Sequence, residues 1–91
     1  MQQLIYHSPH GAPVRVTVSA LIEGSHAKFG VSRCSYKDNF VKKIGRQRAI
    51  ERAEKTPIIT VRVPKRVPMG KWFVSTAEGI AKVMILNPEL V

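Results

Sequence analysis

Arginine and lysine side chains offer the clearest chemistry in this sequence, and most of them lie between residues 33 and 71. A guanidinium group donates two parallel hydrogen bonds to a phosphate or to a guanine edge, and a lysine ammonium group attracts a phosphate as a point charge. The pattern predicts binding of a polyanion. Its candidate binding residues are Arg33, Lys37, Lys42, Lys43, Arg46, Arg48, Arg52, Lys65, Arg66 and Lys71.

The net charge favours an anionic partner. The chain of 91 residues has 15 lysine and arginine residues against 6 aspartate and glutamate residues, which gives a formal net charge of +9. DNA or RNA is the preferred partner, ahead of an acidic protein surface. No membrane partner is expected, because the basic segment lacks a broad apolar face. The alternative is a solvated basic surface without a partner, which is the usual state of charged residues on a helix.

Enzyme chemistry is not indicated. The sequence contains no glycine-rich phosphate loop, no HExxH motif, no paired cysteines at zinc spacing and no nucleophile elbow. His7 and His10 are spaced for a metal, but no third ligand is close in the sequence, so a solvated loop is the better interpretation. We therefore expect a non-enzymatic protein without catalytic residues, metal ligands or a cofactor.

Cys34 is the single cysteine of the chain, so it cannot form an intrachain disulfide. A small apolar residue on a strand is the preferred interpretation, because no histidine base is near in the sequence. A reducing cytoplasm is the expected location. The sequence has no apolar run of about 20 residues and no signal-peptide features at its N-terminus.

The hydrophobic pattern predicts one α+β domain over residues 1–91, with a small antiparallel sheet of three to five strands. One long basic helix is expected to pack on this sheet, and a short C-terminal helix follows, in the order β-β-β-α-β-β-α. The second and third strands should pair with their apolar faces on the same side. A modest core also leaves a homodimer open. The strand-like segments are residues 2–6, 14–22, 27–33, 58–63 and 71–74.

The long helix is predicted from Ser35 to Lys55. Ser35 and Asp38 match a capping box at its start. Pro57 ends it, because the residue before a proline is pushed out of the helical region. Glu51 and Lys55 are spaced for a favourable ion pair along the helix.

Small residues are predicted to seat this helix on the sheet. Gly45 in the middle of a helix costs about 1 kcal/mol relative to alanine, and close packing is a reason to tolerate it. A bend of the helix at Gly45 is the alternative. Gly30 in the third strand either weakens that strand or marks close approach by another backbone. The predicted contact ridge has a four-residue spacing and consists of Val41, Gly45, Ala49 and Ala53.

The segment after the helix is predicted as a hairpin whose tip is basic and proline-rich. Lys65, Arg66 and Lys71 are the candidates for phosphate contacts in this segment. Trp72 is a candidate for stacking on a base, although burial in a core strand is the preferred interpretation.

A second capping pattern, Ser75 with Glu78, predicts the start of the short C-terminal helix. A strand over residues 82–86 is the alternative, because this stretch contains a continuous apolar run. The apolar positions with helical spacing are Ala77, Ile80, Ala81 and Met84.

The run from Gly30 to Arg46, GVSRCSYKDNFVKKIGR, resembles small accessory proteins encoded by bacteriophages and mobile elements. The resemblance implies modulation of nucleic-acid machinery and assigns no role to any residue. With the charge, it predicts a nucleic-acid-binding protein that contacts the phosphate backbone through the basic helix and the basic loop. The alternative is a small basic protein that binds and inhibits or modulates an acidic site of a host protein complex.

Overall fold

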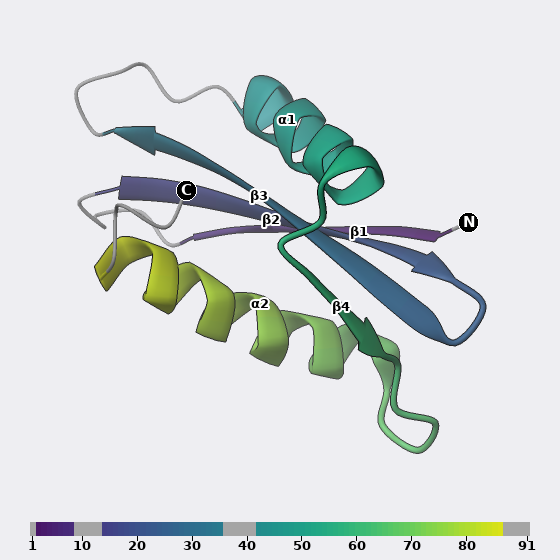
Figure 1. Ribbon diagram of the computed structural model, residues 1–91. Helices are drawn as coiled ribbons and strands as arrows, with labels where there is room; N and C mark the ends of the chain where they lie inside the picture. Colours follow the sequence, from purple (N-terminus) through teal and green to yellow (C-terminus); the bar gives the residue numbers. More distant parts are fainter. Residues whose placement is uncertain (1, 9–13, 36–41, 87–91) are drawn as a thin grey trace.

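Four strands and two helices make up the described part of the fold (Figure 1). The structure is a computed structural model, and it describes residues 2–8, 14–35 and 42–86. The strands form one antiparallel sheet in the order β1-β2-β3-β4, so the predicted α+β class is confirmed. In chain order the elements are β1 (Gln2–His7), β2 (Val14–Glu23), β3 (His26–Ser35), α1 (Lys42–Lys55), β4 (Ile59–Arg62) and α2 (Met69–Leu86).

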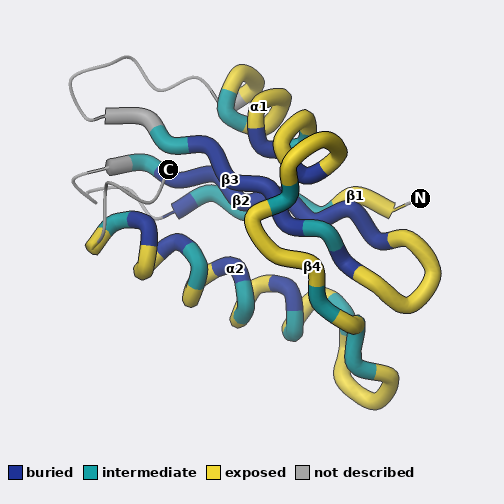
Figure 2. The backbone as a smooth tube through the Cα atoms, viewed as in Figure 1, coloured by how far each residue is buried: buried dark blue, intermediate teal, exposed yellow. Residues whose placement is uncertain are grey.

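One face of the sheet carries the apolar core. In the register of β2 with β3, Val18 lies opposite Val31 and Ala20 lies opposite Phe29, so the predicted shared apolar face is confirmed. α2 covers this face, and its Phe73 ring stacks on the Phe29 ring with centroids 6.1 Å apart. Removal of these side chains from water holds α2 on the sheet, and Figure 2 shows the buried stretches of β2, β3 and α2 in dark blue.

α2 also reaches across the sheet to the edge strand β1. Leu4 and Tyr6 of β1 pack against the core cluster. Burial raises the pKa of the Tyr6 hydroxyl, and the Glu78 carboxylate of α2 adds to the shift because it disfavours a second negative charge nearby. One flank of α2 is therefore in contact with β1.

Small and polar residues on the opposite face of the sheet support α1. Thr17, Ser19 and Ser32 alternate with the apolar residues of their strands and are buried. The Ser32 hydroxyl donates a hydrogen bond of 2.9 Å to the carbonyl oxygen of Gly45 in α1. Figure 1 shows α1 and α2 on opposite sides of the sheet. Short side chains on this face allow α1 to lie close to the strands.

Gly30 allows the closest contact between α1 and β3. A Cβ atom added at Gly30 would overlap the carbonyl oxygen of Ala49 and the backbone nitrogen of Ala53, and it would lie 2.9 Å from the Ala53 Cα atom. Ala49 and Ala53 have no exposed surface in this contact. The predicted close approach at Gly30 is therefore confirmed. The predicted ridge is confirmed for Gly45, Ala49 and Ala53, and Val41 lies outside the described residues.

We expect Gly30→Ala to destabilise the protein strongly, because the new methyl group meets backbone atoms that cannot rotate away. The expected loss is about 3 kcal/mol of unfolding free energy, measured by urea denaturation. Gly79→Ala in α2 is the matched control, because its Cβ position has no heavy atom within 4 Å. This control should raise stability by up to about 1 kcal/mol. A Gly30→Ala protein as stable as the wild type would contradict the contact.

The described part of α1 begins at Lys42, later than the sequence predicts. Ser35 is the last residue of β3, so the predicted helix start at Ser35 is wrong. The physical reason is that β2 pairs with β3 as far as Ser35, which takes its backbone into the sheet. Asp38, the other residue of the predicted cap, lies outside the described residues. The predicted end is confirmed, because α1 ends at Lys55 ahead of Pro57.

α2 is longer than the predicted C-terminal helix and replaces the predicted last strand. It has 18 residues, against 14 in α1. The predicted return strand over residues 71–74, its hairpin and the helix start at Ser75 are therefore wrong, as is the strand alternative for residues 82–86. The segment is helical because its buried residues recur at the period of a helix and all face the sheet. These residues are Phe73, Ala77, Ala81 and Met84.

Candidate nucleic-acid interface

α1 presents charged side chains to solvent because its small residues lie against the sheet. Figure 2 shows the outward turns of this helix as exposed. Its first turn contains no acidic residue. The N-terminus of a helix carries a partial positive charge, so cations near it strengthen the local positive potential. We call this surface the α1 cationic face, and it consists of the exposed residues Lys43, Arg46, Arg48, Arg52 and Lys55.

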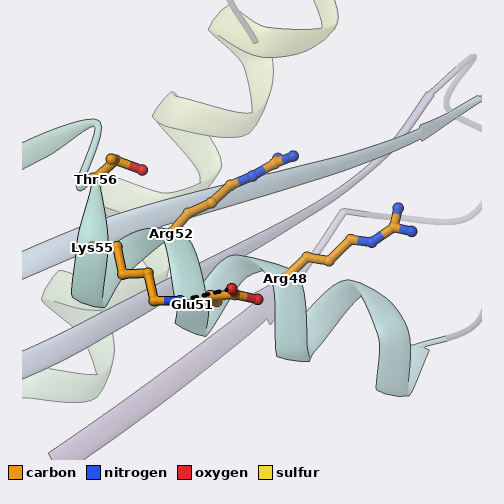
Figure 3. Close-up of a pocket in the computed structure, with 5 residues that line it drawn as sticks. All are labelled: Arg48, Glu51, Arg52, Lys55 and Thr56. Atoms are coloured by element: carbon orange, nitrogen blue, oxygen red, sulfur yellow. Dashed lines mark hydrogen bonds and ion pairs between the residues drawn. The ribbon is translucent and has the colours of Figure 1, made fainter.

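A shallow pocket of about 330 Å³ lies along the C-terminal half of this face. Figure 3 shows the Arg48 and Arg52 side chains extending from successive turns of α1 toward the same side. Lys55 joins them because residues three and four apart are neighbours on a helix surface. The pocket therefore offers several N–H donors to an anion. Its lining residues are Arg48, Glu51, Arg52, Lys55 and Thr56.

Lys55 and Thr56 were not among the predicted binding residues. The spacing of Lys55 from Arg48 and Arg52 was a signal that could have identified it. The Lys55 ammonium group lies 3.1 Å from the Glu51 carboxylate, so the predicted ion pair is confirmed. Because both side chains are exposed, the pair contributes little to stability. Its main effect is to reduce the positive charge at this end of the pocket.

Arg52 is held in place by the sheet. Its Nη1 atom donates a hydrogen bond of 2.7 Å to the carbonyl oxygen of Val31 in β3. β4 pairs with β3 only between His26 and Phe29, so the Val31 carbonyl lies beyond the end of that pairing. Arg52 thus occupies an acceptor that a longer β4 would have used. A guanidinium group has five N–H donors, so this bond orients Arg52 and leaves other donors for a ligand.

We expect Arg52→Ala to lower the unfolding free energy by about 1 kcal/mol, because it removes a charge-assisted hydrogen bond that is partly exposed to water. Arg48→Ala is the control, since the structure shows no hydrogen bond or ion pair from Arg48 to any other described residue. Its stability should stay within about 0.5 kcal/mol of the wild type. Thermal or urea denaturation distinguishes the two variants. Equal losses would show that the Val31 bond adds nothing to stability.

The basic loop is separated from α1. Residues 63–68 connect β4 to α2, and Lys65 and Arg66 in this connection are exposed. Lys71 is exposed in the first turn of α2. In Figure 1 the connection lies at the lower right, whereas α1 lies above the sheet. The structure therefore places the basic loop apart from the α1 cationic face, because β4 lies between them along the chain. Joint contact of the helix and the loop with one partner stays a prediction.

Three further cations were predicted to bind, namely Arg33, Lys37 and Lys42. Arg33 pairs across the sheet with Val16, whose side chain belongs to the core under α2, so Arg33 lies on the α2 side. Lys42 is the first residue of α1. Lys37 falls outside the described residues.

Trp72 packs on the core from the first turns of α2. It is half-buried, and its ring meets the edge of Phe29 with centroids 5.9 Å apart and an interplanar angle of 71°. The preferred interpretation, burial, is confirmed, although the residue lies on a helix rather than on a strand. Stacking of Trp72 on a base stays a prediction.

Comparison of the chain with protein-family models, with curated proteins and with solved structures gave no match. Within residues 2–8, 14–35 and 42–86, neither helix is long and apolar enough to cross a membrane. In the same ranges, no group of three or more histidine, cysteine, aspartate or glutamate side chains is arranged to hold a metal ion. The α1 cationic face is the feature of these residues with the most distinct chemistry.

Proposed function

We propose that this protein is a non-enzymatic, cytoplasmic nucleic-acid-binding protein whose main contacts are to the phosphate backbone. The observation that carries the proposal is the α1 cationic face. Its cations project from one helix, and the first turn of this helix contains no acidic residue. Arg46 and Arg48 have no hydrogen-bond or ion-pair partner among the described residues. Cations without partners are available to neutralise phosphates.

The rigid seat of α1 supports this proposal. Contacts at Gly30 and Gly45 define how the helix lies on the sheet, so its cations are presented in a defined arrangement. Arg52 is already oriented by Val31 and loses less side-chain entropy when it meets a phosphate. Arg48 and Arg52 lie on successive turns and can meet neighbouring phosphates of one strand.

We expect Arg46→Glu combined with Arg48→Glu to weaken binding to DNA and RNA oligonucleotides. Wild-type affinity should fall with salt, with a slope of about −3.6 in log K against log salt on duplex DNA for about four phosphate contacts. The double variant removes two phosphate contacts, so the magnitude of this slope should fall by about 2, since each contact contributes about one unit. Fluorescence anisotropy across a salt series measures both quantities, with circular dichroism as a check on the fold.

Lys65→Glu combined with Arg66→Glu is the matched control, because it changes the net charge by the same amount in the loop between β4 and α2. We expect this control to keep most of the wild-type affinity. Equal losses of affinity in the two variants would show that binding depends on the total charge of the protein rather than on the α1 cationic face. Wild-type binding that is absent at low salt or unaffected by salt would contradict the proposal, and an acidic protein retained from nuclease-treated lysate would then favour the protein-partner alternative.

A further inference from the structure

The shallow pocket along α1 contains an acidic side chain among its cations. Glu51 is the one acid among the described residues that line the pocket, which also include two arginines and a lysine. A carboxylate repels a phosphate, so a site for phosphate alone would bind more tightly without it. α1 also ends at Lys55, and the partial negative charge of a helix C-terminus disfavours a phosphate there. This end of the pocket therefore suits an uncharged ligand that has both hydrogen-bond donors and acceptors.

Glu51 and Lys55 place an acceptor and a donor side by side at this end of the pocket. The Lys55 Nζ atom lies 3.1 Å from the Glu51 Oε1 atom, and Figure 3 shows the two side chains joined by this bond. The bond uses one of about four acceptor positions of the carboxylate and one N–H donor of the ammonium group. Oε2 of Glu51 has no partner within the described residues. Both side chains are exposed, so a ligand can reach the remaining donors and acceptors without a change of fold.

The Watson–Crick edge of guanine matches this pair. It presents two adjacent donors, the N1–H group and the N2 amino group, followed by the O6 acceptor. A carboxylate accepts from both donors, one on each oxygen, and an ammonium group beside the oxygen that faces N1 then lies next to O6. Adenine, cytosine, thymine and uracil each present a single donor group on this edge. None of these four bases makes two hydrogen bonds to one carboxylate in this way.

We propose that the Glu51–Lys55 pair recognises an unpaired guanine base in a nucleic-acid strand. The inference rests on the proposed function and adds a base preference to it. In a duplex the Watson–Crick edge is already paired, so the base belongs to a single-stranded segment. Arg48 and Arg52 extend from the same stretch of α1 and hold neighbouring phosphates of the strand (Figure 3). The phosphate contacts then supply most of the affinity, and Glu51 supplies the specificity.

Single strands of five nucleotides test the base preference, because their phosphates match the about four contacts expected for the α1 cationic face. Fluorescence anisotropy is measured on oligothymidine strands whose central base is thymine, guanine or hypoxanthine. We expect guanine to bind about tenfold more tightly than thymine, since a bidentate contact to a base provides discrimination of that order. Hypoxanthine keeps N1–H and O6 but lacks the N2 amino group, so it should lose most of this gain.

Glu51→Gln separates base recognition from charge. The variant removes a negative charge, so its affinity for the thymine strand should rise. Its amide presents a donor where the carboxylate accepts, so the guanine preference should fall below about twofold. Glu54→Gln is the matched control, because Glu54 is also an exposed acid of α1 but does not line the pocket. This control should raise the affinity for both strands alike and keep the preference of about tenfold.

The outcomes distinguish this inference from the proposed function. Salt-dependent binding with equal affinity for the guanine and thymine strands would overturn the inference and leave the proposed function standing, whereas no binding of any strand at low salt would overturn both. Hypoxanthine that binds as tightly as guanine, or a guanine preference that survives Glu51→Gln, would also overturn the inference.

Free guanosine monophosphate tests whether the base has to belong to a strand. It should compete only above about 1 mM, because it lacks the neighbouring phosphates. Competition at the concentrations where the guanine strand itself binds would assign the pocket to a free nucleotide and overturn recognition of a strand.

Discussion

The approach of the α1 backbone to Gly30 determines which residues this protein presents to its surroundings. The helix lies on β3 through Ala49 and Ala53, with Gly45 against β2 and β3. Once these small residues face the sheet, the long cationic side chains of α1 lie on its margins and outer side. The charged surface is therefore a consequence of close packing. A larger residue at position 30 would displace the helix and its cations together.

The sheet separates two kinds of surface because its two faces differ in chemistry. One face is apolar and is covered by α2, which leaves an uncharged groove at Ile58, Ile59 and Val83 beside the short strand β4. The other face is small and polar where it contacts α1, whose outer side is cationic. Alternation of residue types along β2 and β3 produces both faces at once. The α1 cationic face and the uncharged groove thus lie on opposite sides of the sheet.

The sequence was sufficient for the parts of the fold that follow from local spacing. The alternation of Val16, Val18 and Ala20 predicted β2, and the four-residue spacing of small residues predicted the seat of α1. The start of α2 was missed, because Trp72-Phe73-Val74 is compatible with a strand as well as with a helix. The stacking of Phe73 on Phe29 supports the helix. A contact between segments far apart in the sequence cannot be predicted from the local hydrophobic pattern.

In the candidate site, too, some features follow from the local sequence and others depend on tertiary contacts. The cations of α1 were predictable from composition and spacing, because a basic helix needs no tertiary contact to be recognised. The separation of the basic loop from α1 was not predictable, since it depends on the direction in which β4 leaves the helix. The bond from Arg52 to Val31 was also hidden, because it joins a helix to a strand edge that only the assembled sheet creates.

The bond from Arg52 to Val31 also covers a backbone acceptor at the edge of β3. An open strand edge offers carbonyl groups to any extended chain that meets it, and it is a common starting point for unwanted strand pairing between molecules. At Val31 the acceptor is already occupied by the guanidinium group of Arg52. The charge of that group also repels other copies of a cationic chain. Arg52 thereby protects the edge of β3 at the point where the cover of β4 ends.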